Sequence, residues 1–236
     1  MAPVNYIPIA TTVFSLYFFI KLYRHWSNHR RSVYIFWWML GVFFYGAGTV
    51  TESINTLAGY SDANFKAWYI FGALLGGAPL AQGTVHLLMK KRTANVLSVL
   101  LTVAIIISSV LVILSPLKPG PHVKLGGSIL EWQFIRAITP FINIYAFVFL
   151  VGGAIYSAVL YANDKTYRSR LWGNVLIAIG GLLPGIGGSS AKAGYVEVLY
   201  VTEFIGLCFI YAGYEIIHRG SASSVHSNQA EIAVKA

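Results

Sequence analysis

Long runs of apolar residues, separated by short polar loops, recur along almost the whole chain. Each run is long enough, at about 1.5 Å per helical residue, to cross the roughly 30 Å hydrocarbon layer of a bilayer. The pattern predicts an all-α, polytopic integral membrane bundle of seven transmembrane helices, over Ile7 to Tyr23, Val33 to Leu57, Ala67 to Met89, Asn95 to Ser115, Trp132 to Tyr161, Leu171 to Ser190 and Tyr195 to Ile217.

The composition agrees with a membrane protein. Of the 236 residues, 56% are hydrophobic and 11% are charged, whereas about 25% charged residues is usual in soluble domains. No segment is long enough for a separate water-soluble catalytic or DNA-binding domain. We expect one transmembrane domain over residues 1–219 and a short cytoplasmic tail over residues 220–236, which is disordered because its residues are small and polar.

The positions of the basic residues predict the orientation. Twelve of the seventeen Lys and Arg residues fall in loops on one side of the predicted helices, and the cytoplasmic loops of membrane proteins carry the excess of Lys and Arg. We therefore expect a multi-pass protein of the plasma membrane with its N-terminus outside and its C-terminus in the cytoplasm. The net charge of +9 indicates membrane lipids rather than nucleic acid as partners, because the charges flank apolar segments instead of forming a stripe.

Cysteine and histidine usage indicates neither a disulfide framework nor a metal site. The one cysteine, Cys208, stands inside an apolar run, and the sequence has no H-E-x-x-H motif. The chain also lacks an N-glycosylation motif, which favours a prokaryotic source. We predict no metal and no cofactor.

Glu203 is the acidic residue that the sequence places deepest in the membrane. It lies fourteen residues before the predicted cytoplasmic end of the seventh helix, about 21 Å along a helix and thus roughly 9 Å below the outer boundary. It shares a helix face with Gly206, Ile210 and Gly213. Because an ionised carboxylate at that depth must be paired, protonated or hydrated, it is a candidate functional residue.

Other polar residues are predicted at a similar depth. Glu52 shares a face of the second helix with Trp38, Gly41, Tyr45 and Gly48, and Arg136 offers a basic partner for either acid. Alternatively, Arg136 and Glu52 extend to the outer interface. A shared pocket would satisfy these groups together, so we predict one outward-facing cavity lined by Tyr45, Glu52, Arg136, Asn143 and Glu203.

A second polar group is predicted near the cytoplasmic side. Gln82 and His86 are four residues apart and share one face of the third helix, and His25, His29 and His218 fall on the same side. These imidazoles either bind a metal or haem, or relay protons, or are ordinary residues of the membrane interface. In the same helix Pro79 predicts a kink beside two glycines, which serves either as a hinge or for close packing alone.

Three classes of function remain open. A carrier is favoured by the acids and by a faint repeat, in which Gly41, Gly46 and Gly48 recur 139 residues later as Gly180, Gly185 and Gly187; chance explains this repeat equally well. A sensor, or an accessory or structural subunit of a larger membrane complex, is favoured by the small-residue packing faces. The sequence leaves open whether the protein acts alone, as a homo-oligomer or within a larger membrane complex. An intramembrane enzyme is less favoured, because no nucleophile motif with a usable base occurs. We predict a non-enzymatic protein that binds or translocates a small molecule or ion.

Overall fold

The structure, a computed structural model, describes residues 3–28, 31–120, 122 and 125–235, with their side chains except those of Lys165 and residues 221–235. Within these ranges the chain is α-helical and contains no strand. The α-helices are α1 (Ile7–Asn28), α2 (Val33–Ala58), α3 (Asp62–Trp68), α4 (Ala78–Leu88), α5 (Lys91–Leu114), α6 (Phe134–Ala146), α7 (Gly153–Tyr161), α8 (Arg168–Lys192) and α9 (Val196–Lys235).

Shorter helical elements join several of these helices. Two are π-helical, η2 (Tyr69–Leu74) and η4 (Phe147–Gly152), and the second makes α6, η4 and α7 one continuous helix. The others are 3₁₀ turns, η1 (Pro3–Tyr6), η3 (Gly127–Ile129) and η5 (Lys165–Tyr167).

Six helical stretches in the described part of the chain are long and apolar enough to cross a membrane. They confirm an all-α membrane protein that spans the bilayer several times. They cover Pro3–Asn28, Val33–Ala58, Lys91–Leu114, Phe134–Tyr161, Arg168–Lys192 and Val196–Gly220. The predicted count of seven helices and the predicted orientation are not established by length and composition, and both stay predictions.

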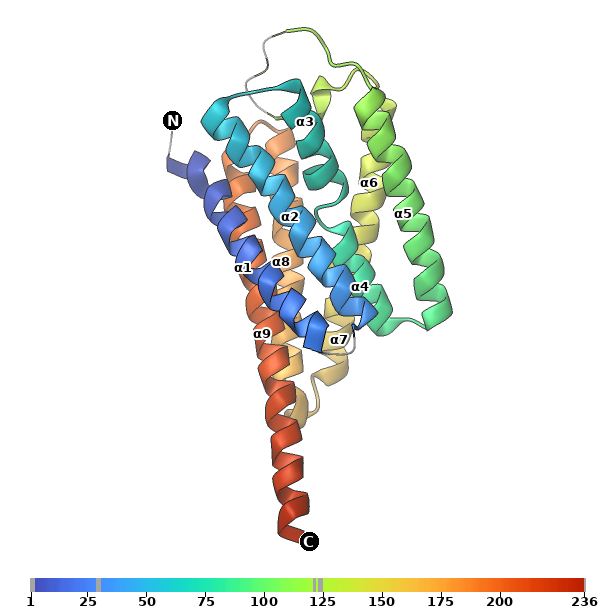
Figure 1. The fold of residues 1–236 in the computed structure, drawn as a ribbon, viewed down its shortest axis with the longest axis vertical. Helices are drawn as coiled ribbons and strands as arrows, with labels where there is room; N and C mark the ends of the chain where they lie inside the picture. Colours follow the sequence, from blue (N-terminus) through green and yellow to red (C-terminus); the bar gives the residue numbers. More distant parts are fainter. Residues whose placement is uncertain (1–2, 29–30, 121, 123–124, 236) are drawn as a thin grey trace.

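The third predicted helix is broken. It consists of α3, η2 and α4, with a bend at residues 75–77 before α4 begins with Pro79 in its first turn. Proline has no N–H to donate to the carbonyl of Leu75, and Gly76 and Gly77 weaken the helix at the same place. The kink predicted at Pro79 is therefore confirmed, and Figure 1 shows that α3 and α4 together run from one end of the bundle to the other.

Helices α8 and α9 pack closely along small residues. Three glycines of α8 recur every seven residues and face α9, so that an added Cβ at Gly180 would lie 2.6 Å from the Gly206 carbonyl oxygen. Such small-residue seams allow helix backbones to approach closely in membranes. The facing residues are Gly173 with Gly213, Gly180 with Gly206, and Gly187 with Leu199.

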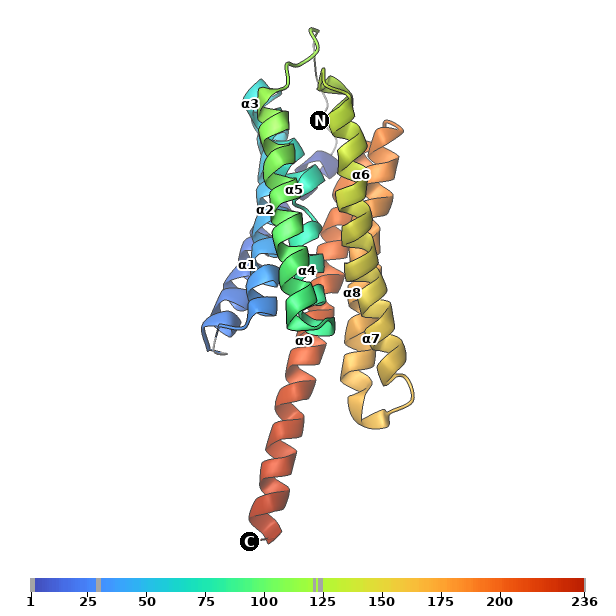
Figure 2. The ribbon, with the colours of Figure 1, turned by 90° about the vertical axis from the view of Figure 1, so that its right-hand side faces the viewer.

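Helices α7 and α1 flank this pair, α7 against α8 and α1 against α9. Helix α1 lies against both α2 and α9. Helix α5 stands at the edge of the bundle in Figure 1 and faces the viewer in Figure 2. Many large apolar side chains of α5 point outward; Val99 and Leu100, for example, are 62% and 60% exposed. In a water-soluble protein such a surface would be unfavourable, but it suits contact with lipid.

Helix α9 continues beyond the bundle. It extends as helix to Lys235, well past the other helices (Figure 1), where the sequence analysis predicts a disordered tail from residue 220. The segment after Gly220 contains neither proline nor glycine, and a helix that already exists extends without a new nucleation cost. The division of the chain into a transmembrane domain, 1–219, and a cytoplasmic tail, 220–236, stays a prediction.

Candidate functional site

Two glutamates from opposite parts of the chain meet inside the bundle. Glu52 of α2 is 2% exposed, and its carboxyl group lies within hydrogen-bonding reach of that of Glu203 in α9. Glu203 as a whole is half-buried, but one carboxyl oxygen of each residue is buried with no hydrogen-bond partner among the described residues. On α2, Glu52 lies on the same buried face as Tyr45 and Gly48, as predicted, and this face directs its side chain toward α9. We call Glu52 and Glu203 the carboxyl pair.

Among the side chains that the structure describes, no basic residue pairs with the carboxyl pair. Among the described side chains the ion pairs formed by Lys and Arg with acidic residues go to Glu215, and none goes to Glu52 or Glu203. Two negative charges about 4 Å apart repel by about 4 kcal/mol at an effective dielectric constant of 20, and burial adds a desolvation cost. Both effects favour a pair that holds a proton or another cation over one with two negative charges.

Aromatic side chains surround the carboxyl pair. The Tyr45 hydroxyl donates a 2.8 Å hydrogen bond to the main-chain carbonyl oxygen of Glu203, and the Trp68 Nε1–H donates one of 3.1 Å to a carboxyl oxygen of Glu52. Tyr200, one turn before Glu203 on α9, is 6% exposed and near enough to interact electrostatically with both acids. These aromatic side chains thus supply two hydrogen-bond donors at the carboxyl pair and shield it from bulk solvent.

The broken third helix positions Trp68. Gly48 of α2 and Gly72 of η2 approach so closely that a Cβ at Gly48 would lie 3.2 Å from the Cα of Gly72. This contact brings the end of α3 against α2, one turn from Glu52. π-helical turns and broken helices recur at functional sites in membrane proteins. The sequence analysis did not place Trp68 or Tyr200 at this site. For Tyr200 a signal was available, because a residue three positions before Glu203 lies on the same face of a helix.

Arg136 and Asn143 do not join the carboxyl pair, which corrects the prediction of a five-residue cavity and of an Arg136 pair with Glu203 or Glu52. Both are exposed, and Arg136 donates a 2.9 Å hydrogen bond to the Gln133 side chain. The reason lies in the periodicity of α6. Ile135 and Ile142 are buried, so the residues that follow each of them are turned by about 100° away from the core.

The two best-formed grooves of the described structure lie away from the carboxyl pair. Two apolar grooves lie on the surface of the bundle, and neither is lined by Tyr45, Glu52 or Glu203. The first runs between α7 and α8. The second runs between α1 and α9, where it is lined by Tyr6, Ile9, Ala10, Val13, Phe14, Tyr17 and Phe204.

The predicted group at the other end of the bundle does come together. Gln82 is fully buried, and its side-chain amide donates hydrogen bonds to the Ala94 carbonyl oxygen, 3.1 Å, and the Ser98 hydroxyl, 2.8 Å. His86 contacts the same hydroxyl at 2.8 Å, and Tyr145 of α6 donates to the Gln82 side-chain oxygen. This network joins α4, α5 and α6, so its role in the structure is to hold those helices together.

Histidines of the N- and C-terminal helices also meet. His25 of α1 and His218 of α9 have ring centroids 4.5 Å apart, and His25 Nδ1 lies 2.5 Å from the Tyr214 hydroxyl. His29 lies outside the described residues. One helical turn nearer the membrane centre, Lys21 pairs at 2.7 Å with Glu215. Among the described residues no group of three or more His, Cys, Asp or Glu side chains is placed to hold a metal ion.

Comparisons of this chain with protein-family profiles, with curated proteins and with solved structures returned no match. The argument for function therefore rests on the site itself.

Proposed function

We propose that this multi-pass membrane protein binds and translocates a proton at the Glu52–Glu203 carboxyl pair. The observation that carries the proposal is the close approach of the buried Glu52 carboxyl group and the Glu203 carboxyl group, one oxygen of which is buried, with no basic neighbour among the described residues. A proton shared between them removes the repulsion and leaves one hydrogen-bonded pair with a single negative charge.

In this proposal, proton binding is coupled to helix movement. When the shared proton leaves, two carboxylates face each other, and repulsion between them favours separation of α2 from α9 at the end of the bundle that is predicted to face outward. Helices α3 and α4 can follow, because the bend at residues 75–77 separates α3 and η2 from α4. Proton release thus favours an open arrangement of these helices, and proton binding a closed one.

The proposal assigns transport and no chemical reaction to the protein. It also places the protein in the plasma membrane of a prokaryotic cell, with the carboxyl pair in the outer half of the bilayer. The excess of basic residues in short loops on one side supports the orientation, and the lack of an N-glycosylation motif supports the prokaryotic source.

Proton flux into vesicles tests the proposal. Purified protein is reconstituted with a pH-sensitive dye inside the vesicles, and an external pH step is applied with valinomycin and potassium present to balance charge. We expect dye acidification at least tenfold faster than in empty vesicles, and loss of this excess rate in Glu52→Gln and Glu203→Gln. Glu131→Gln is the matched control, because Glu131 is an exposed acid in an interhelical connection. Equal rates in all variants and in empty vesicles would refute translocation.

A sensor is the second candidate, and the continuity of α9 favours it. One uninterrupted helix carries Glu203 and extends beyond the bundle to Lys235, so movement at the carboxyl pair would reach a partner at the other end. In that case vesicles show no proton flux, whereas the distance from the end of α9 to α8, measured between spin labels, changes with pH and stops changing in Glu203→Gln.

A further inference from the structure

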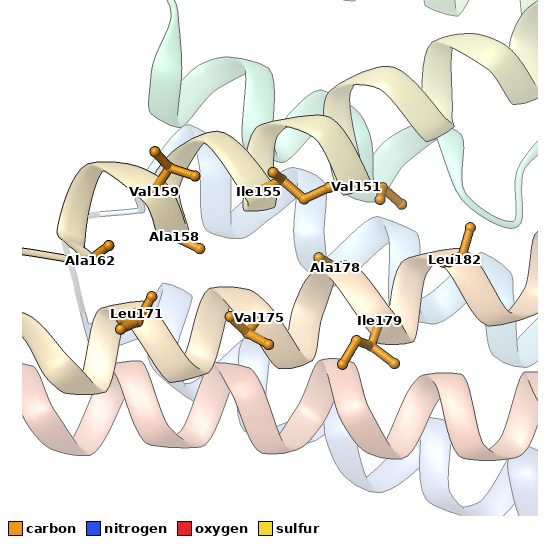
Figure 3. Close-up of a pocket in the computed structure, with 10 residues that line it drawn as sticks. All are labelled: Val151, Ile155, Ala158, Val159, Ala162, Leu171, Val175, Ala178, Ile179 and Leu182. Carbon is orange, nitrogen blue, oxygen red and sulfur yellow. The ribbon is translucent and has the colours of Figure 1, made fainter.

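The groove between α7 and α8 has an entirely apolar lining and opens sideways, on the surface of the bundle that faces lipid. It has a volume of about 450 Å³ and is walled on one side by Ile155 and Val159 of α7 and on the other by Val175 and Ile179 of α8 (Figure 3). Three of these side chains are more than 40% exposed. In a bilayer the groove therefore faces lipid chains rather than water.

The length of the groove matches one leaflet. Its lining on α8 begins at Leu171, three residues after that helix starts, and ends at Leu182. Eleven residues span about 16 Å of helix, which is about half of the roughly 30 Å hydrocarbon thickness. The groove thus runs from one end of the bundle to about the middle of the membrane, the distance that a single acyl chain covers.

A guanidinium group bridges the mouth of the groove. Arg170 of α8 lies over the rings of Tyr161 and Tyr167, with its central carbon 5.3 and 5.0 Å from their centroids, and it donates a 3.1 Å hydrogen bond to the Tyr161 hydroxyl. Tyr161 directly precedes Ala162, and Arg170 directly precedes Leu171. Ala162 and Leu171 are the groove residues nearest this end.

The Arg170 charge has no acidic partner among the described side chains. The nearest acid in the connecting segment, Asp164, accepts a 2.9 Å hydrogen bond from the Thr166 main-chain N–H instead. The stacked rings hold the guanidinium in place, and the Tyr161 hydroxyl accepts from only one of its two terminal nitrogens. A guanidinium fixed in this way favours the planar, two-point recognition of a phosphate group.

We propose that this groove binds one anionic phospholipid, with an acyl chain along α7 and α8 and the phosphate group at Arg170. The apolar lining accounts for the chain and the one-leaflet length for its depth. The uncompensated cation at the mouth accounts for the headgroup, since basic pockets between transmembrane helices on the cytoplasmic side bind such headgroups. The predicted orientation places this mouth at the cytoplasmic leaflet, where anionic lipids gather. The proposal does not depend on proton translocation.

Native mass spectrometry of the detergent-solubilised protein tests the lipid site. Phosphatidylglycerol and phosphatidylcholine with identical acyl chains are titrated separately, and inorganic phosphate is added in a third series. We expect one phosphatidylglycerol to bind at least fivefold more tightly than phosphatidylcholine, because one basic residue near the surface contributes about 1 kcal/mol. Inorganic phosphate alone should not be retained.

Two variants and a control separate the headgroup from the chain. Arg170→Gln should lower the affinity for phosphatidylglycerol about fivefold and leave that for phosphatidylcholine unchanged. Ala162→Trp, at an exposed position of the mouth, should weaken both lipids. Arg92→Gln, an exposed arginine at the same end of the bundle, should change neither. If Arg170→Gln fails to fold, Ala162→Trp still decides, because it retains the arginine.

Three results would overturn the proposal. The first is equal affinity for the two lipids, and the second is binding that Ala162→Trp leaves unchanged. The third is a dimer that Ala162→Trp dissociates, because a second copy of the chain would then occupy the groove.

Discussion

The hydroxyl group of Tyr45 in α2 donates a 2.8 Å hydrogen bond to the main-chain carbonyl oxygen of Glu203 in α9, 158 residues further along the chain. Because Glu203 lies inside α9, its carbonyl oxygen also faces the main-chain N–H one turn further along the helix. The Tyr45 hydroxyl is therefore a second donor to this oxygen. This bond fixes the register of α2 against α9 at the level where the two carboxyl groups meet. It connects the fold directly to the candidate site.

Tyr45→Phe should destabilise the protein by about 0.5 to 1.5 kcal/mol, the net contribution of one buried hydrogen bond. Thermal unfolding in detergent, followed by circular dichroism, measures the effect. Tyr156→Phe is the control, because Tyr156 is 61% exposed on α7 and should unfold like the wild type. Equal stability of the two variants would show that the Tyr45 bond does not tie α2 to α9.

The two glycines Gly180 and Gly185 should respond oppositely to alanine. A Cβ at Gly180 would lie 2.6 Å from the Gly206 carbonyl oxygen, whereas one at Gly185 meets nothing within 4 Å. Gly180→Ala should therefore cost about 1 to 3 kcal/mol, as overpacking does. Gly185→Ala should be neutral or stabilising, because alanine favours helix by up to about 1 kcal/mol. Chemical unfolding in mixed micelles compares them, and a destabilising Gly185→Ala would contradict this packing of α8 on α9.

Lys21 should matter more for stability than Arg219, although both bind Glu215. The Lys21 ammonium joins α1 to α9 at 2.7 Å, whereas the Arg219 contact at 3.1 Å stays within α9 and its side chain is 78% exposed. Lys21→Met should cost about 1 kcal/mol, because one-third of that side chain is exposed and screened by solvent, and Arg219→Met at most about 0.5 kcal/mol. Thermal unfolding at low and high salt provides the comparison; the reverse order would show that α1 is not tied to α9 by Lys21.

Thiol labelling tests the predicted orientation. A cysteine introduced at Lys91 should not react with a membrane-impermeant reagent added outside intact cells, whereas one at Lys118 should react, in a background where Cys208 is serine. Both lysines are exposed, Lys91 at the start of α5 and Lys118 four residues after its end at Leu114, so accessibility of the thiol itself is matched. Labelling at residue 91 alone would reverse the topology.

The sequence predicted the helical membrane fold well because apolar periodicity and loop charge act locally. Helix spacing alone also determines which residues share a face, and the faces predicted to carry Glu52 and Glu203 are those on which Gly48 and Ile210 are buried. The prediction that Arg136 and Asn143 line a shared cavity was wrong, because the depth of a residue along a helix does not determine which way its side chain points around the helix axis. The packing of Ile135 and Ile142 against the core sets the rotation of α6. The sequence alone does not show which helices pack against α6, so this rotation could not be predicted.

Other features depend on contacts between distant segments and were missed for that reason. Trp68 reaches Glu52 only because the third helix breaks and η2 packs on Gly48. Pro79 and the two glycines before it predicted the break but not the direction in which α3 would turn. The π-helical turns at η2 and η4 likewise have no simple sequence signal, because they arise from one extra residue accommodated within a packed helix.

Infrared difference spectroscopy of the carboxyl groups tests the central claim, that Glu52 and Glu203 share a proton. Protonated carboxyl groups have a carbonyl stretch, which shifts in D₂O and which ionised carboxylates lack. At neutral pH the wild type should show such a band, Glu203→Gln should shift or abolish it, and the double variant Glu52→Gln/Glu203→Gln should lack it. A wild-type spectrum identical in this region to that of the double variant would contradict the account.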